Sequence, residues 1–317
     1  MRTSVPAEPG LQELNTTLLA QDIRAAMPLP AGLDSRFEAA LRHVLDHPGS
    51  LVRPRMAMEI AAAYDLAPAP AADLAIALEY FHTASLIFDD LPCREDATHR
   101  RSAPCVHVAF GEPGAILSAL ALINRAYALA WRALSSSAPA TQPRVMQYLE
   151  QRLGIEGLLN GQSLDLNYAS LPHTREITER IAHGKTVSLI RLTLVLPAMV
   201  AGAPPRELRH LERIAASWGL AYQIVDDLKD VLQSVAETGK SVARDLLLDR
   251  PNTAAAIGVP AAVERLQRLI ALGDRTLSRL LGARPALAFL DQLRNSLQDE
   301  LNRVTASACE MTVRAES

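Results

Sequence analysis

Two long segments of the sequence, residues 71–88 and 115–134, are apolar on nearly all sides. Helices of this kind are normally surrounded by other helices. Both segments are rich in alanine, which favours the helix and allows neighbouring helices to approach closely. No segment alternates with the period of two that a half-buried strand requires. The sequence therefore predicts an all-α fold.

Proline and glycine interrupt the chain at long intervals, which leaves segments of helical length between them. Apolar residues recur three and four apart within these segments, as in Leu33, Phe37 and Leu41. The breaks indicate about ten helices, and no repeat, linker or change in composition marks a second domain. We expect a flexible tail at residues 1–10 and a single domain over residues 11–317.

The composition argues against several classes of protein. With 49% apolar and 21% charged residues, the chain can close a large core. The 32 basic and 35 acidic residues give a formal charge of −3, which does not suggest a nucleic-acid partner. Apolar stretches such as residues 192–203 are shorter than the roughly 18 to 20 residues of a membrane span. Three cysteines without a CxxC pair, and no secretory signal, predict a cytoplasmic protein with no transmembrane segment.

The first candidate site follows the first apolar segment, where Asp89 and Asp90 are adjacent. Two carboxylates beside apolar surface need a cation or a raised pKa, because desolvation and like-charge repulsion both oppose ionisation. Pro92 prevents the helix from continuing, so Glu95 and Asp96 can fold back towards the pair. This arrangement would suit a divalent metal.

A second acidic cluster, Asp226, Asp227 and Asp230, has the spacing of one helical face. A single cluster of this kind is more often a solvated surface, here with Lys229 as a partial counter-ion. Two clusters, each set in apolar helix, favour a shared metal site. Carboxylates without histidine or cysteine suit a hard ion such as Mg²⁺, which commonly binds phosphate oxygens as well. We therefore expect a phosphate ester as the ligand.

Several cations lie close in sequence to these clusters or between them. Each alone would more often be a surface residue, but arginine binds phosphate in a bidentate manner and lysine supplies a point charge. The candidates are Arg100, Arg101, Lys185 and Lys240.

Five motifs, in this order, resemble those of the trans-isoprenyl diphosphate synthases, the polyprenyl synthetase family, and most of all the bacterial geranylgeranyl diphosphate synthases. They read FDDLPCRED, GQSLDL, GKTVSL, QIVDDLKD and ETGKSVARD. The resemblance implies an all-α bundle around a deep apolar cavity, the isoprenoid synthase fold. It also implies about two or three Mg²⁺ ions per active site, a homodimer, and condensation of an allylic diphosphate with isopentenyl diphosphate to a longer trans-polyprenyl diphosphate.

The resemblance also assigns roles to individual residues. Metal binding falls to Asp89, Asp90, Glu95, Asp226, Asp227 and Asp230. Contacts to the allylic diphosphate or the developing cation fall to Lys185, Thr186, Gln223 and Lys240. Substrate binding falls to Arg53, His82, Arg100, Arg101, Gln162 and Asp165. Outside the resemblance, a histidine on an apolar helix is usually a core residue, and Gln162 with Asp165 could equally form an interhelical hydrogen bond.

One motif of the family is degenerate in this chain. The family's GKRxRP, which binds isopentenyl diphosphate, corresponds to GSLVRP, where Ser50 and Leu51 replace a lysine and an arginine and Arg53 remains. Each lost charged hydrogen bond is worth about 1.5 to 3 kcal/mol. A terpene synthase-like lyase that ionises one prenyl diphosphate is therefore an alternative, and a non-catalytic partner subunit is a third. The other intact motifs favour the prenyltransferase.

Product length in such a synthase depends on residues just before the first acidic motif. Ala84 and Ser85 are small, which is compatible with a product of geranylgeranyl length or more. Phe81, one turn away, could still form the floor of the cavity.

Overall fold

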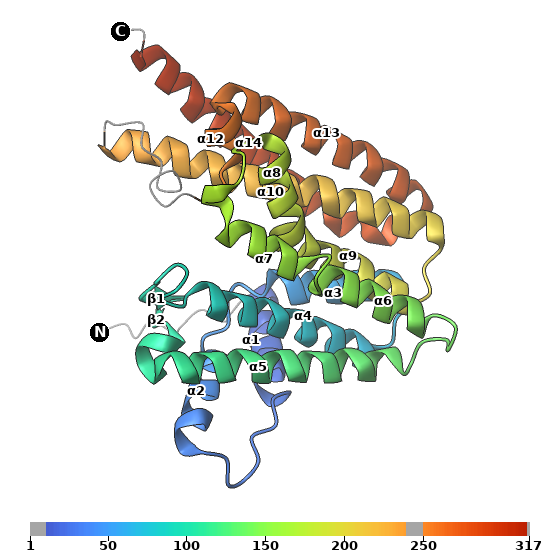
Figure 1. Cartoon of the computed structure of the whole chain (residues 1–317). Coiled ribbons are helices and arrows are strands. Elements are labelled where there is room, and N and C mark those ends of the chain that lie inside the picture. The colour runs from blue at the N-terminus through green and yellow to red at the C-terminus, as the bar shows by residue number, and fades with distance from the viewer. Residues whose placement is uncertain (1–10, 239–249, 316–317) are drawn as a thin grey trace, which may run out of the picture. The chain divides into compact units, whose positions relative to one another are not determined.

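The structure, a computed structural model, describes residues 11–238 and 250–315 (Figure 1). Helices make up most of it, so the predicted all-α fold is confirmed. The strands in the described part of the chain are β1 (His99–Arg100) and β2 (Ala103–Pro104), which form one short hairpin. The predicted tail at residues 1–10 and the candidate Lys240 lie outside the described residues.

The chain divides into two compact units. Unit 1 comprises Met1–Met56 and Ala69–Ala133, and unit 2 comprises Ala57–Pro68 and Leu134–Ser317. The expected single domain stays a prediction. Unit 1 contains the first acidic motif and the degenerate motif, and unit 2 contains the second acidic motif.

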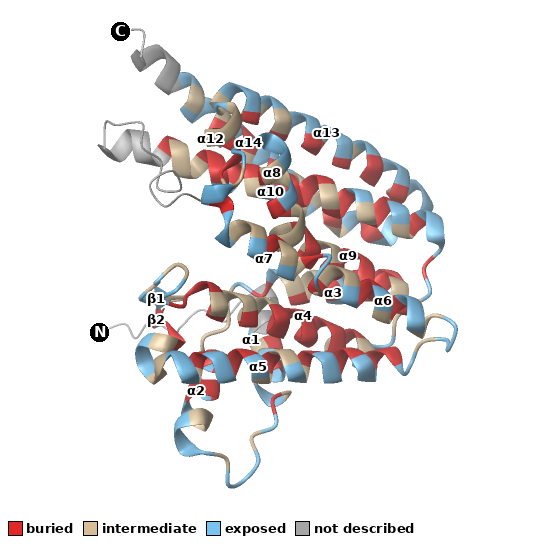
Figure 2. Ribbon diagram, viewed as in Figure 1, coloured by how far each residue is buried: buried red, intermediate tan, exposed pale blue. Residues whose placement is uncertain are grey.

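Unit 1 is built around a buried apolar helix. Its helices are α1 (Leu11–Ala25), α2 (Ser35–Asp46), the first part of α3 (Val52–Ala63), α4 (Pro68–Asp89) and α5 (Val106–Leu134). α4 is buried along most of its length, as its apolar sequence predicts (Figure 2). The hydroxyl of Tyr80 on α4 donates to the carbonyl of Ile23 at 2.5 Å. Arg132 of α5 forms an ion pair with Asp73 of α4. These contacts hold α1 and α5 against α4.

Unit 2 is arranged around the long helix α10. Its elements are α6 (Gln142–Leu153), α7 (Leu158–Leu166), η1 (Tyr168–Ser170), α8 (Arg175–Ala182), η2 (His183–Val187), α9 (Ser188–Val200), α10 (Pro205–Thr238), α12 (Thr253–Ile257), α13 (Val259–Ala283), η3 (Pro285–Phe289) and α14 (Leu290–Ala315). α10 packs against α9, α13 and α14. A Cβ atom on Gly273 of α13 would lie 2.1 Å from Nε1 of the buried Trp218 on α10. Glycine at this position therefore allows the two helices to approach closely.

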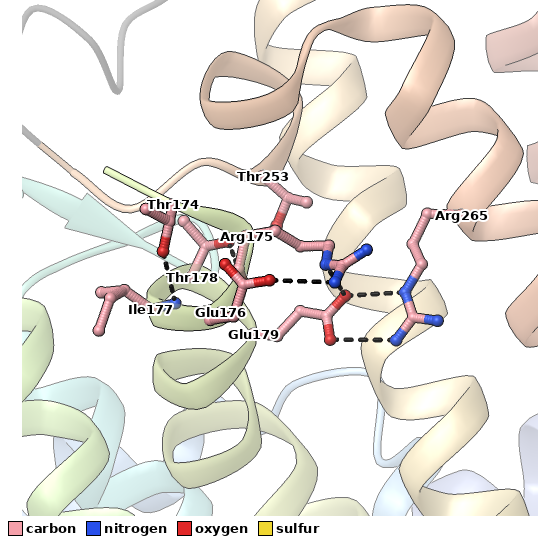
Figure 3. Close-up of polar contacts among 8 residues, drawn as sticks. All are labelled: Thr174, Arg175, Glu176, Ile177, Thr178, Glu179, Thr253 and Arg265. Atoms are coloured by element: carbon pink, nitrogen blue, oxygen red, sulfur yellow. Dashed lines mark hydrogen bonds and ion pairs between the residues drawn. The ribbon is translucent and has the colours of Figure 1, made fainter. Parts of the chain in front are cut away.

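Helix α8 is held in unit 2 by side chains at its start and along one face (Figure 3). Thr174 caps the helix by accepting from the amide of Ile177 at 3.4 Å. Arg265 of α13 binds Glu179 with two contacts of 2.7 and 3.0 Å. At the other side, the Thr253 hydroxyl lies 3.4 Å from that of Thr178. α8 is thereby connected to both α12 and α13.

Two helices, α4 and α5, are long and apolar enough to cross a membrane by length and composition alone. The expectation that no apolar stretch approaches that length therefore does not hold for these helices. The window in α4 is 72% buried, as in the core helix of a soluble protein, whereas that in α5 is 28% buried.

Candidate active site

The first acidic motif forms a closed turn at the end of α4. Asp89 and Asp90 are buried, with 6% and 3% of their surface exposed. The chain turns back after Pro92, and the amide of Glu95 donates to the carbonyl of Asp89 at 3.1 Å. Glu95 therefore returns to the pair as predicted. Asp96 does not, because its side chain is 73% exposed and its φ is +47°.

Arginines neutralise these buried carboxylates. Nη2 of Arg94 lies 3.0 Å from Oδ1 of Asp89. Arg100 approaches Oδ1 of Asp90 at 2.6 Å through both Nε and Nη2, and Glu95 at 3.6 Å. Burial would lower the pKa of Arg100, but the hydrogen bond and charge of Asp90 raise it. The positive charge expected beside the two aspartates is thus provided by Arg94 and Arg100, which follow them in the chain. Sequence reasoning missed Arg94, although it lies inside the motif.

The hairpin of β1 and β2 directs two arginines to different partners. Its two turn residues, Arg101 and Ser102, have φ values of +53° and +63°. Positive φ at both positions is the backbone that a tight two-residue hairpin requires. Arg100 faces the first acidic motif, while Nη2 of Arg101 lies 3.3 Å from Oε1 of the buried Glu79.

A second polar group in unit 1 joins α3 to α4. Nη1 of Arg53 lies 3.0 Å from Nε2 of His82. Burial, followed by the charges of Arg53, Arg101 and Arg100, lowers the pKa of His82 to about 2. The ring is therefore neutral, and because Arg53 donates to Nε2, the proton resides on Nδ1. The buried Nδ1 has no hydrogen-bond partner among the described residues.

The degenerate motif contributes to the core at one of its altered positions. Leu51, which the resemblance aligns with an arginine, is 2% exposed and has a φ of +53°. Ser50 is exposed. A Cβ atom on Gly49 would lie 2.7 Å from Cζ of Arg101, so this guanidinium packs on the glycine backbone. The apolar replacement is thus buried, while Arg101 occupies the space beside the motif.

A pocket within unit 1 borders the first acidic motif and the hairpin of β1 and β2. Its lining includes Asp90 and Arg100 of the first motif and Arg101 of the hairpin. His43 and His47 of α2 line it as well. The predicted substrate residues Arg100 and Arg101 are therefore brought to one pocket.

The predicted chain-length residues lie on the buried part of α4. Phe81 and Ala84 are 5% and 1% exposed, and Ser85 donates its hydroxyl to the carbonyl of His82 at 2.8 Å. The Phe81 ring meets Tyr127 of α5 edge to face, with centroids 4.9 Å apart. Tyr127 is a neighbour that sequence reasoning did not identify.

In unit 2, α7 and η2 touch through two glycines of predicted motifs. A Cβ atom on Gly161 would lie 2.5 Å from the backbone nitrogen of Lys185, and one on Gly184 would lie 2.6 Å from Cα of Gly161. No larger residue fits at either position without moving the backbone. η2 is a π-helical turn, a feature frequent at functional sites, and it carries Lys185 and Thr186.

A chain of polar contacts extends from α7 to the second acidic motif. Nζ of Lys185 lies 3.1 Å from Oδ2 of Asp165. The Thr186 hydroxyl donates to Oε1 of Gln223 at 2.8 Å, and Nε2 of Gln223 donates to Oδ1 of Asp227 at 3.0 Å. Five predicted site residues of unit 2 therefore form two contact groups. One group is Asp165 with Lys185, and the other is Thr186 with Gln223 and Asp227; Lys185 and Thr186 are neighbours in η2. Gln162 is half-buried beside Gly161.

The acids of the second motif have different surroundings. Asp227 is 3% exposed and accepts a 2.7 Å hydrogen bond from the amide of Thr253. Asn252 donates to the Asp227 carbonyl at 3.0 Å. Asp226 is exposed and Asp230 is half-buried, four residues apart on one face of α10. No sequence motif indicated Asn252 or Thr253.

These residues suit a hard cation in their chemistry. Among the described residues, no three His, Cys, Asp or Glu side chains are grouped closely enough to hold a metal ion. In unit 1 the acids contact arginines, and in unit 2 Asp227 contacts an amide side chain and a backbone N–H. The donors are carboxylate oxygens, which Mg²⁺ prefers. The donor atoms of the two motifs therefore fit Mg²⁺, which would replace the present arginine and amide contacts of the carboxylates.

Comparison with known proteins agrees with this chemistry. Residues 34–275 match the family described as "Polyprenyl synthetase". The chain is 34% identical over 264 residues to the heterodimeric geranylgeranyl pyrophosphate synthase large subunit 1 of Arabidopsis thaliana, covering 80% of this chain and 69% of that one. It is 33% identical over 244 residues to the geranylgeranyl diphosphate synthase of Pantoea ananas, covering 76% and 78%.

The fold is also that of a solved structure, the geranyltransferase of Helicobacter pylori complexed with magnesium and isoprenyl diphosphate. The TM-score is 0.72 at 24% identity, over 97% of this chain and 100% of that one. The family match covers most of the sequence, and both curated relatives exceed 30% identity over more than two thirds of their length. The chain therefore belongs to the polyprenyl synthetase family and is a prenyltransferase.

Proposed function

We propose that this prenyltransferase condenses an allylic prenyl diphosphate with isopentenyl diphosphate, in a Mg²⁺-dependent reaction, to a trans-polyprenyl diphosphate of about geranylgeranyl length. The three cysteines and their lack of a CxxC pair support a cytoplasmic location. The relatives named above as geranylgeranyl diphosphate synthases support the product class.

The observation that carries this proposal is the second polar group of unit 1. Arg53 is held by His82, and Arg101 is held by Glu79. Together they provide two guanidinium groups, donors that suit a diphosphate. An enzyme that ionises a single diphosphate at the acidic motifs has no need of this second group.

Mg²⁺ would be held by the acidic motifs, through Asp89, Asp90, Glu95, Asp226, Asp227 and Asp230. Bound there, it offsets the negative charge that develops on the leaving diphosphate. The geranyltransferase of Helicobacter pylori, which has the same fold, binds both magnesium and an isoprenyl diphosphate. In unit 2, Asp226 and Asp230 present the accessible carboxylates, and Asp227 also orients Gln223.

The chain's own residues would then bind and orient the allylic substrate. The Lys185 ammonium, which is paired with Asp165, would contact its diphosphate. Thr186 and Gln223 fix each other, so their remaining dipoles can face the developing allylic cation without reorganisation. After attack by the double bond of isopentenyl diphosphate, one proton leaves to the released pyrophosphate. Exclusion of water by apolar walls protects the cation.

The direct test is an incubation of the purified protein with Mg²⁺ and geranyl, farnesyl or geranylgeranyl diphosphate, with and without isopentenyl diphosphate. Longer diphosphates that form only with isopentenyl diphosphate support the proposal. Asp89→Ala and Asp226→Ala should abolish turnover. Arg53→Gln should raise KM for isopentenyl diphosphate by about tenfold, the loss expected for one charged hydrogen bond, with KM for the allylic substrate unchanged. Near-normal activity in either aspartate variant would contradict the metal assignment.

One observation favours the lyase as the second candidate. Leu51 is buried and Ser50 carries no charge, so two of the cations expected near isopentenyl diphosphate are absent. Hydrocarbon or alcohol released from a single diphosphate, with no elongation, would establish that activity. Inactivity of the protein alone, restored by a partner synthase, would indicate a partner subunit.

We also propose a homodimer that buries one face of α5. Five large apolar side chains there are 39% to 60% exposed, and helical geometry places them within an arc of about 100°. They are Ile116, Leu117, Leu120, Tyr127 and Trp131. Tyr and Trp are frequent anchors of protein interfaces. The Arabidopsis thaliana relative is named as the large subunit of a heterodimer, so it supports subunit association but not a pairing of identical chains.

A further inference from the structure

The first acidic motif contains an arginine, Arg94, that is paired with one of its proposed metal ligands, Asp89. Arg94 lies between Asp89 and Glu95 in sequence, and its Nη2 is 3.0 Å from Oδ1 of Asp89. The side chains of Arg94 and Asp89 are 12% and 9% exposed. The Coulomb attraction within an ion pair shielded from water is stronger than within one on the surface. The contact is therefore part of the resting state of the motif.

The backbone holds Arg94 at this place. Its amide donates to the carbonyl of Leu91 at 2.8 Å, and the next amide, that of Glu95, donates to Asp89 at 3.1 Å. The turn that brings Glu95 back to the pair therefore also carries Arg94 to Asp89. The contact with Asp89 itself is made by the Arg94 side chain alone.

Arg100 has different contacts from Arg94. It contacts both Asp90 and Glu95, and it borders the pocket of unit 1. The pocket lining does not include Arg94 or Asp89. Arg94 is thus the cation paired with the acid at the helix end, and this acid is one of the proposed metal ligands.

We infer that Arg94 and a divalent cation exclude each other at Asp89, so that the first motif binds its metal tightly only together with a diphosphate, which receives the displaced guanidinium. This inference rests on the proposed function. Mg²⁺ binds a carboxylate oxygen at about 2.0 to 2.1 Å, and a guanidinium on the same oxygen would repel it. Phosphate oxygens are a matching partner for the guanidinium, because they accept two parallel hydrogen bonds from it.

The test separates binding of the metal from binding of the metal with diphosphate. Mn²⁺ binding to the full chain is measured by electron paramagnetic resonance without any diphosphate, and binding of the preformed Mg²⁺–pyrophosphate complex by calorimetry. Arg94→Gln should bind Mn²⁺ about tenfold more tightly than the wild type and bind Mg²⁺–pyrophosphate about tenfold more weakly. Opposite changes of this kind are not produced by a general loss of structure.

Two further variants make the result specific. Arg42→Gln removes the same charge from an exposed ion pair with Glu38 in unit 1, and both affinities should stay at the wild-type values. Arg94→Met, which keeps the aliphatic stem, repeats the test if Arg94→Gln does not fold. Equal Mn²⁺ affinity in the wild type and the folded Arg94 variant overturns the inference, even where prenyl transfer is intact. Absence of metal binding in both, with and without pyrophosphate, overturns it together with the metal assignment of the proposed function.

Discussion

Gly161 and Gly184 meet backbone to backbone, and a Cβ atom on Gly161 would lie within 2.5 Å of the Lys185 nitrogen. Gly161→Ala should therefore push η2 away from α7, lower stability by about 1 to 3 kcal/mol, and reduce kcat because Lys185 and Thr186 move with η2. Thermal unfolding and steady-state kinetics would measure both effects. Ser163→Ala, at an exposed position of the same helix, is the control and should leave both unchanged. Wild-type kinetics in Gly161→Ala would show that the contact does not position these residues.

The contact between Gly273 and Trp218 gives a prediction about stability alone. Gly273→Ala would place a methyl group 2.1 Å from the indole Nε1, so it should destabilise unit 2 by about 1 to 3 kcal/mol. Gly282→Ala, in the same helix, meets no atom within 4 Å and should be neutral or stabilising. Chemical denaturation of both variants provides the comparison. The prediction fails if the two glycines tolerate alanine equally.

His82 should make stability depend on pH. Its pKa is lowered to about 2 in the folded state from an ordinary value of 6.5, so the unfolded chain binds a proton that the folded chain does not. Stability therefore falls as the pH decreases below 6.5, by up to about 2 kcal/mol between pH 6.5 and 5. His82→Asn should flatten this dependence, as measured by urea unfolding at each pH. The other histidines are common to both proteins and cancel. Identical slopes would contradict a neutral, buried His82.

Product length should respond to Ala84. The side chain is 1% exposed on α4, so phenylalanine there would project into whatever apolar space accommodates the growing chain. Ala84→Phe should give a shorter prenyl diphosphate, with some loss of stability from overpacking. Chromatography of the products measures the length, and Ser85→Ala is the control that adds no bulk. An unchanged product would place the floor of the cavity elsewhere.

The exposed face of α5 should be required for dimerisation. Leu120→Lys puts a charge where the leucine is 51% exposed, so it should convert a dimer into a monomer. Light scattering after size-exclusion chromatography gives the mass. Leu272→Lys on α13, where the leucine is 44% exposed, should leave the dimer intact. If the wild type is monomeric at micromolar concentration, the proposed dimer is wrong.

The sequence predicted those features that depend on local pattern. The absence of strand-like alternation and the periodicity of three and four gave the all-α class, and Pro92 explained why Glu95 returns to Asp89. The motif residues Lys185, Asp165 and Gln223 were identified by resemblance. In unit 2, Lys185 contacts Asp165, and Gln223 contacts Thr186 and Asp227.

Features that depend on distant contacts could not be predicted. The pairing of Arg94 with Asp89 depends on a rotamer, and an acidic motif alone does not show which cation will neutralise it. Thr253 binds Asp227 through its backbone amide, a group that every non-proline residue has, so no side-chain pattern marks it. The division into two units was not indicated by composition, because no linker or change in composition separates them along the chain.

The π-helical turn η2 makes this part of the chain sensitive to length as well as to side-chain identity. A π turn corresponds to a helix with one inserted residue, and each residue of an α-helix advances by about 100°. Deleting one residue between His183 and Val187 would remove the extra residue of the π turn and rotate Lys185 away from Asp165. A deletion scan would therefore detect a requirement for helical register here that substitution of single residues would not.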